Sequence, residues 1–151
     1  MLCGRFKHTI DNKNRLFIPA KHREQLGECF VIMQNTDGCL DVVTLRSRQE
    51  LEEKLNSFPR SQTAEIRRFL FSQSCECVPD SQGRVVIPTP LMEFAEIEKN
   101  AVIIGVGDHV EIWSERRWDE HMQSSSIEKI SADMIALGIC RVQSRKGLRY
   151  E

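Results

Sequence analysis

Two short stretches of the sequence decide the fold. Residues 10–19 read Ile-Asp-Asn-Lys-Asn-Arg-Leu-Phe-Ile-Pro, and residues 79–88 read Pro-Asp-Ser-Gln-Gly-Arg-Val-Val-Ile-Pro. Asp, Arg, Ile and Pro recur at the same places, always 69 positions apart. This repeat predicts that the chain contains two copies of one small unit. Because two copies are too few for a solenoid, we expect a pseudo-symmetric pair in which each half covers the apolar face of the other.

Each copy begins with a polar turn and continues as a short strand. Asp11 and Asp80 are expected to accept hydrogen bonds from turn amides. Asn14 and Gly83 occupy the position of the turn most prone to a positive φ. After the turns we expect short strands at 15–18 and 84–87, each ended by a proline. A helix is expected to follow at 20–26 in the first copy, and in the second copy a helix with Thr89 as its N-cap and Pro90 as its first residue. Further strands are expected near 29–34 and 39–44, and near 101–106 and 109–113.

A helical connector is expected between the two copies. Its first helix covers residues 49–55, where Glu50 and Lys54 stand four positions apart and can form an ion pair. Ser61 or Thr63 is expected to cap a second helix. The resulting organisation is a first repeat at 5–47, the connector at 48–73 and a second repeat at 74–118. Residues 119–151 are expected to hold a C-terminal helix, near 127–137, followed by a basic tail from Arg141 onward.

Positive charge gathers at the two ends of the chain. The first 36 residues hold six basic and three acidic side chains, and the segment from Arg141 onward holds four basic and one acidic. The stretch 37–140 is acidic, so a polyanion would be guided to one part of the surface. No apolar run approaches the roughly 20 residues that span a bilayer, and the N-terminus lacks a signal-peptide core. We therefore expect no membrane partner and a cytoplasmic location.

The six cysteines are scattered and form no Cys-x-x-Cys pair. Zinc sites of the finger and ribbon type usually present their ligands in closely spaced pairs. Cys75 and Cys77 are the one close pair, and on a strand they would share a face, which suits packing as well as chemistry. We predict reduced, mostly buried cysteines, no metal site and no cofactor.

Motifs of enzymatic catalysis are missing from the sequence. It contains no glycine-rich phosphate loop, no Gly-x-Ser-x-Gly elbow and no His-Glu-x-x-His helix, so we predict that the protein is not an enzyme. His8 and His22 stand in basic surroundings and are interpreted as surface or phosphate-contacting groups. Trp113 and Trp118 lie on or near an apolar strand end and predict packing in the core or at a subunit interface.

The paired Asp-x-x-x-Arg turns, each followed by an apolar strand and a proline, resemble the paired motifs of the MraZ family, bacterial transcription regulators related to AbrB-type swapped-hairpin DNA-binding domains. The resemblance implies a β-rich α+β fold: two tandem swapped-hairpin β-α-β units packed as an intrachain pseudo-dimer, with a helical connector and a C-terminal helix. It also implies a nucleoid-associated, ring-shaped homo-oligomer, an octamer or a dodecamer. Such a ring is expected to bind short direct repeats in double-stranded promoter DNA, including that of the cell-division and cell-wall operon.

The residues expected to contact DNA are Arg15, Lys13, Lys7, Arg84 and Lys21, and the residues expected to shape the turns are Asp11, Asn14, Asp80 and Gly83. An arginine in this place either grips a base or phosphate or forms a salt bridge to the aspartate four residues earlier, and the two roles are compatible. The second turn has Gln82 where the first has Lys13, and Leu91-Met92-Glu93 is taken to replace Lys21-His22-Arg23, which weakens the case for Arg84. An antitoxin-like or protein-binding module on an AbrB-type scaffold, with a partner bound by the residues after Trp118, is the alternative.

Overall fold

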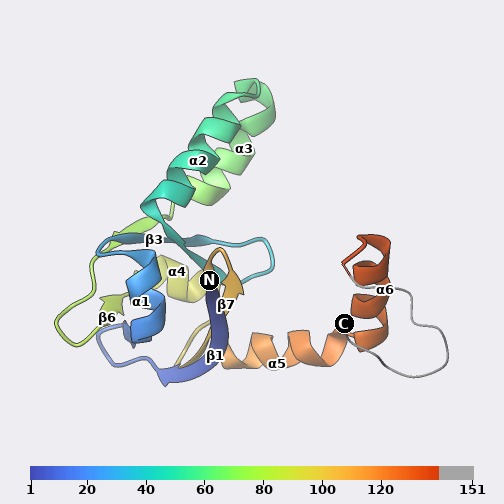
Figure 1. Ribbon diagram of the computed structural model, residues 1–151. Helices are drawn as coiled ribbons and strands as arrows, with labels where there is room; N and C mark the ends of the chain where they lie inside the picture. Colours follow the sequence, from blue (N-terminus) through green and yellow to red (C-terminus); the bar gives the residue numbers. More distant parts are fainter. Residues whose placement is uncertain (140–151) are drawn as a thin grey trace. The chain divides into compact units, whose positions relative to one another are not determined.

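The computed structural model describes residues 1–139 (Figure 1). The chain divides into one unit of residues 1–118 and another of residues 119–151, and each is described by itself. The expected basic tail and Cys140 lie outside the described residues. In chain order the elements are β1 (Leu2–Thr9), β2 (Arg15–Phe17), α1 (Ala20–Leu26), β3 (Phe30–Gln34), β4 (Leu40–Thr44), α2 (Leu45–Asn56), α3 (Arg60–Phe71), β5 (Cys75–Cys77), β6 (Arg84–Val86), α4 (Thr89–Phe94), β7 (Asn100–Gly107), β8 (Val110–Ser114), α5 (Glu115–Ser124) and α6 (Ile127–Ala136).

Six strands form one antiparallel sheet in the order β1-β7-β8-β4-β3-β5. β1 of the first repeat pairs along its whole length with β7 of the second, from Leu2 opposite Gly107 to Thr9 opposite Asn100. In exchange, β5 of the second repeat pairs with β3 of the first. The two repeats therefore swap strands within one chain, which confirms the expected α+β fold of two interleaved units.

The turn strands of the two repeats meet in a separate two-stranded ribbon, β2–β6. Leu16 stands opposite Val85 at its centre. The amide of Ile18 donates to the carbonyl of Gly83, and the amide of Ile87 donates to the carbonyl of Asn14. Because these two hydrogen bonds exchange equivalent positions of the repeats, the ribbon lies on a pseudo-two-fold axis.

One core fills the space between the ribbon and the six-stranded sheet. Leu16 from β2 and Val85 from β6 are almost completely buried in it. The largest fully buried side chains that join them come from both repeats: Ile18, Phe30, Ile32, Leu40, Ile87, Leu91, Ile103 and Ile112. Burying a side chain of this size contributes about 1.5–3 kcal/mol, so the shared core joins the two repeats into one unit.

A smaller apolar cluster lies on the other face of the sheet. It contains Cys39, Val102, Ile104 and Trp113, with Trp118 packed against it. The two tryptophan rings meet edge to face with centroids 5.6 Å apart. The predicted packing role of the tryptophans is confirmed. Among the described cysteines, Cys39 and Cys77 are buried, Cys29 and Cys75 are half-buried and Cys3 is exposed, all as free thiols, so the prediction of buried cysteines holds only in part.

The short helices correct three details of the sequence interpretation. α4 begins at Thr89 itself, after Pro88, so Thr89 is not the N-cap. The amides of His22 and Leu91 both donate to the proline three positions earlier, so His22 corresponds to Leu91 and the replacement expected from the sequence is out of step by one residue. His22 is 1% exposed rather than at the surface. It lies against β1, where its Nε2 donates to the carbonyl of Cys3 at 3.0 Å.

The connector is a hairpin of two helices that lie side by side and project from the sheet (Figure 1). α2 starts earlier than expected because the Thr44 hydroxyl accepts a hydrogen bond from the amide of Ser47. Glu50 pairs with Arg46 at 3.1 Å, not with Lys54. α3 begins after Pro59, so neither Ser61 nor Thr63 caps it, and Thr63 is instead buried within the helix.

The described part of the second unit consists of the end of α5 and of α6. α6 follows the N-cap Ser126, whose hydroxyl accepts a hydrogen bond from the amide of Lys129, and it covers nearly the expected range. Ile127, Ile130 and Met134 recur at helical spacing and are 81%, 49% and 36% exposed. No helix among residues 1–139 is both long enough and apolar enough to cross a membrane.

Candidate nucleic-acid interface

The two turns have the same hydrogen-bonded construction. In the first, Oδ1 of Asp11 accepts the amides of Lys13 and Arg15, each at 2.9 Å. Oδ2 of Asp11 accepts Nε of Arg15 at 2.6 Å. The backbone closes the loop, because the Asn14 amide donates to the Asp11 carbonyl and the Asp11 amide donates to the Arg15 carbonyl. The aspartate therefore fixes both the turn and the arginine that follows it.

The second turn repeats this construction with its own residues. Oδ1 of Asp80 accepts the amides of Gln82 and Arg84, and Oδ2 accepts Nε of Arg84 at 2.9 Å. The backbone amides of Arg15 and Arg84, followed by the other hydrogen bonds of each turn, hold the pKa of Asp11 and Asp80 below its ordinary value. Both carboxylates are thus ionised at neutral pH, and the salt-bridge interpretation of these arginines is confirmed.

The ion pairs leave part of each guanidinium available. Only Nε of Arg15 and Nε of Arg84 donate to the aspartates, and the terminal nitrogens make no hydrogen bond within residues 1–139. The two side chains are 29% and 28% exposed. A guanidinium held by Nε presents its two terminal nitrogens as a fork, which suits bidentate recognition of a guanine edge or a phosphate.

The ribbon presents the two arginines on one face. Since Leu16 and Val85 point into the core, strand alternation directs Arg15 and Arg84 to the opposite side. Arg15 pairs with Val86, two residues beyond Arg84 in β6. This register places the α-carbons of the arginines about 8 Å apart, from two steps along a strand and one step between strands. A two-stranded ribbon of this kind fits a major groove about 12 Å wide.

Positive φ occurs in both turns at the predicted place, with φ of 57° at Asn14 and 80° at Gly83. Helices of the opposite repeat contact these positions. Nδ2 of Asn14 donates to the Thr89 hydroxyl of α4 at 3.2 Å. Gly83 faces α1 so closely that an added β-carbon would lie 2.7 Å from the Cζ atom of Arg23.

Arg23 is a cation of this face that the sequence analysis missed. Its Nε donates to the Ile18 carbonyl at 2.8 Å, and its Cζ lies 5.6 Å from the centre of the Phe17 ring. The second turn has Gln82 where the first has Lys13, and Arg23 of the first repeat supplies a positive charge beside it. The signal was hidden because Arg23 lies 60 positions from Gly83 and only the strand exchange brings them together.

The predicted lysines fall into two groups. Lys13 in the first turn and Lys21 on α1 are exposed. Lys7 forms an ion pair with Glu115 at 3.0 Å. The neighbouring His8 packs against Phe17 with ring centroids 5.0 Å apart, so alternation along β1 directs Lys7 away from the ribbon. The structure does not bring Lys7 to the face that carries Arg15.

The strand exchange, the central ribbon and the matched turns define a tandem swapped-hairpin protein of the AbrB type. Comparison with protein families gives a match to the family described as "MraZ protein, putative antitoxin-like" over residues 1–69 and again over residues 70–137. Similar curated proteins include the transcriptional regulator MraZ of Caldicellulosiruptor saccharolyticus, which is 44% identical over 92% of this chain and its own full length. The transcriptional regulator MraZ of Heliobacterium modesticaldum is 44% identical over 89% of this chain and 97% of its own.

The chain belongs to the MraZ family. This membership places the protein among transcription regulators rather than among enzymes, as the sequence analysis predicted.

Proposed function

We propose that the protein binds short direct repeats in promoter DNA through the outer face of the β2–β6 ribbon and thereby represses or tunes its own cell-division and cell-wall operon. The proposed setting is the nucleoid in the cytoplasm. One observation carries the proposal: Arg15 and Arg84 lie on the same outer face of one ribbon, and each forms an ion pair with the aspartate four residues earlier. Lys13 adds charge in the first turn, and α1, which places Arg23 beside the second turn, also carries the exposed Lys21.

Substitution of Arg15 by alanine tests the proposed contact. The variant is expected to keep its fold, because the Asp11 hydrogen bonds to the amides of Lys13 and Arg15 do not need the guanidinium. Loss of one phosphate contact lowers the slope of log affinity against log salt by about one unit, and loss of a base contact costs about 1–3 kcal/mol. Titration of promoter DNA at several salt concentrations measures both.

Two variants serve as comparisons for Arg15→Ala. Arg84→Ala removes the matching fork of the second repeat and is expected to weaken binding in the same manner. Arg46→Ala removes an exposed arginine of α2 that pairs with Glu50, and it is expected to leave DNA binding unchanged. DNA affinity of Arg15→Ala equal to that of the parent at every salt concentration would refute the assignment.

The second part of the proposal is that several chains act together as a homo-oligomeric ring. A ribbon with two forks reads few bases, and a good bidentate contact discriminates by only about 1–3 kcal/mol. Each further engaged subunit acts at high effective concentration and multiplies avidity by roughly 10²–10⁴. The exposed apolar stripe of α6, with Ile127, Ile130 and Met134, supports association between chains.

Two measurements test this association. Sedimentation of the free protein at micromolar concentration is expected to show an oligomer, and a monomer would refute it. Probes with one, two, three or four boxes are expected to bind with steeply increasing affinity at physiological salt. Equal affinity for all four probes would show that recognition does not depend on repetition.

An antitoxin-like role is the second candidate, and the family description together with the apolar stripe of α6 favours it. In that role the stripe would bind a different protein. The double variant Ile130→Asp/Met134→Asp separates the two: loss of the oligomer and of binding to multi-box DNA supports the ring. A variant that stays oligomeric and binds DNA like the parent, but no longer retains a partner protein, supports the antitoxin-like role.

A further inference from the structure

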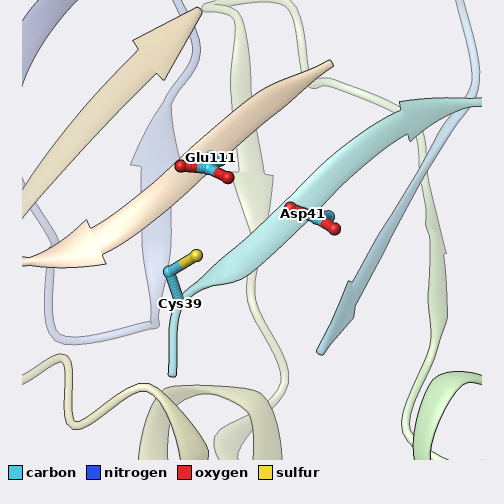
Figure 2. A group of neighbouring side chains, drawn as sticks. All are labelled: Cys39, Asp41 and Glu111. Carbon is cyan, nitrogen blue, oxygen red and sulfur yellow. The ribbon is translucent and has the colours of Figure 1, made fainter. Parts of the chain in front are cut away.

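Four side chains of types that can ligate metals lie near the centre of the six-stranded sheet, on the face away from the ribbon. β4 and β8 are neighbours there, and Asp41 stands directly opposite Glu111. Leu40 and Ile112 point into the main core, so alternation puts Asp41 and Glu111 on the other face. Cys39 precedes β4 on this same face (Figure 2).

The donor atoms lie close to one another. Sγ of Cys39 and one oxygen each of Asp41 and Glu111 are all within 4.8 Å of one another. Nε2 of His109 lies 3.4 Å from Oδ1 of Asp41 and 3.3 Å from Oε2 of Glu111. The four side chains form two pairs, Cys39 with Asp41 from the first repeat and His109 with Glu111 from the second. Each pair is spaced by two residues at matching positions of the repeat.

Neighbouring groups hold these donors in place. Nδ1 of His109 donates to Oδ1 of Asp108 at 2.6 Å, and in the neutral imidazole this leaves a lone pair on Nε2 that faces two carboxylates. Nδ2 of Asn35 donates to Asp41 at 2.9 Å, and Nε1 of Trp113 donates to Glu111 at 3.1 Å. A histidine whose other nitrogen donates to a carboxylate is the usual arrangement around a protein-bound metal.

The two opposed carboxylates of the cluster are unfavourable neighbours without a cation, and the Cys39 thiol lies beside them. Like charges placed directly opposite in an antiparallel pair destabilise it, and Asp41 and Glu111 are such a pair. Cys39 is fully buried, its thiol has no hydrogen-bond partner in another residue among residues 1–139, and its sulfur is on the side of Asp41 and Glu111 (Figure 2).

We propose that Cys39, Asp41, His109 and Glu111 bind one Zn²⁺ ion. Zinc accepts thiolate, imidazole and carboxylate ligands together in a tetrahedral site, whereas the thiol disfavours the hard ions Mg²⁺ and Ca²⁺. Tetrahedral zinc places neighbouring ligand atoms roughly 3.3–3.8 Å apart. The imidazole nitrogen already has this spacing to one oxygen of each carboxylate. The sulfur lies within 4.8 Å of both carboxylates and must move closer, by rotation of the Cys39 side chain, to join the same ion.

The bound ion would tie the two repeats together across their pseudo-two-fold axis. As the zinc–sulfur bond forms, the Cys39 S–H bond breaks and its proton passes to solvent, so the affinity rises with pH. The side chains of Asp41 and His109 are 24% and 27% exposed, which gives the ion a route to the site. The site is separate from the ribbon and does not depend on the proposed DNA contacts.

A proton on His109 is the competing source of positive charge. Burial lowers the pKa of His109, but the carboxylates of Asp108, Asp41 and Glu111 together raise it above its ordinary value. An imidazolium would bridge the two carboxylates and leave no place for an ion. The two states differ in whether the chain binds a divalent metal at all.

Titration of the chelator-treated, untagged full chain with Co²⁺ distinguishes them. We expect one equivalent to bind, with the near-ultraviolet charge-transfer band of a cobalt thiolate, and Zn²⁺ to displace it. Cys39→Ser is expected to abolish the band, and His109→Gln to weaken binding by at least about tenfold. Cys29→Ser and Cys75→Ser, which remove half-buried thiols elsewhere, serve as matched controls and are expected to keep the band.

A second measurement is independent of the variants. One equivalent of Zn²⁺ is expected to raise the thermal unfolding midpoint of the parent, because an ion that binds only the folded chain stabilises it. Failure of the parent to bind Co²⁺, or no change of the midpoint with Zn²⁺, would overturn the proposal and favour the imidazolium. A cobalt band that persists in Cys39→Ser but disappears in Cys29→Ser or Cys75→Ser would also overturn it, by placing the metal at other thiols.

Discussion

Replacement of Gly83 by alanine tests whether the turns depend on the geometry described for them. Gly83 has a φ of +80°, and alanine in the left-handed region costs about 1–2 kcal/mol. The new β-carbon would lie 2.7 Å from Cζ of Arg23. The guanidinium is the flexible end of a side chain and can move, but the movement weakens its hydrogen bond to the Ile18 carbonyl. That bond to a half-exposed charged donor adds about 1 kcal/mol, for a total of about 2–3 kcal/mol.

Urea unfolding at one fixed protein concentration measures this loss in the free energy of unfolding. Gly83→Asn is the matched control, because asparagine occupies the same position of the first turn, as Asn14, with a φ of 57°. Asparagine tolerates this region, so Gly83→Asn is expected to be about 1 kcal/mol more stable than Gly83→Ala. In the double variant Gly83→Ala/Arg23→Ala the two changes are expected to be less than additive. A Gly83→Ala variant within about 0.5 kcal/mol of the parent would refute the reasoning.

Three further predictions concern the core, the strand exchange and the acid range. Leu16 is fully buried at the centre of the ribbon, so Leu16→Ala is expected to lower the free energy of unfolding in urea by about 2–5 kcal/mol. The exposed control Val86→Ala is expected to lower it by less than about 0.5 kcal/mol. Equal losses in the two variants would contradict this. At Gly105 an added β-carbon would lie 2.3 Å from the backbone nitrogen of Cys3 in β1. Gly105→Ala is therefore expected to lower the free energy of unfolding by about 1–3 kcal/mol and to speed amide hydrogen exchange along β1. Unchanged exchange would argue against this. The lowered pKa values of Asp11 and Asp80 contribute stability that is complete above about pH 4 and is lost as pH falls through the lower folded values. The double variant Asp11→Asn/Asp80→Asn should therefore show a flatter acid limb in unfolding midpoints, and equal slopes would exclude the effect.

The sequence predicted the repeats and their turns well because both depend on local chemistry. The aspartate acceptors, the positive φ at Asn14 and Gly83, and the strands after them follow from residues only four positions apart. The existence of two helices in the connector was also predictable from local pattern. Their starts were not, because Thr44 and Pro59 both lie outside the apolar pattern that indicated the helices.

Features that depend on the strand exchange were beyond the sequence pattern. β1 was not predicted because its residues alternate weakly and its partner β7 lies about a hundred positions away. The same exchange places Arg23 on the second turn. The histidine expected at the surface, His22, is buried because α1 presents it to β1. Cys39 and Asp41, like His109 and Glu111, each join a carboxylate to a different residue type, so a pattern of paired cysteines does not reveal them.

The pairing of β1 with β7 has a consequence for how the protein is made. When Leu2 leaves the ribosome, its partner Gly107 has yet to be synthesised, and at about 5–20 residues per second the wait lasts roughly 5–20 s. During that interval β2 and β4 of the first repeat lack their partner strands, because β6 and β8 of the second repeat are not yet complete. Two nascent first repeats on neighbouring ribosomes offer each other the same edges, so their pairing competes with completion of the native chain. Rapid translation of residues 48–110 favours the native pairing. A message truncated before β7 yields a chain whose β1 and outer β4 edge can find strand partners only in another chain.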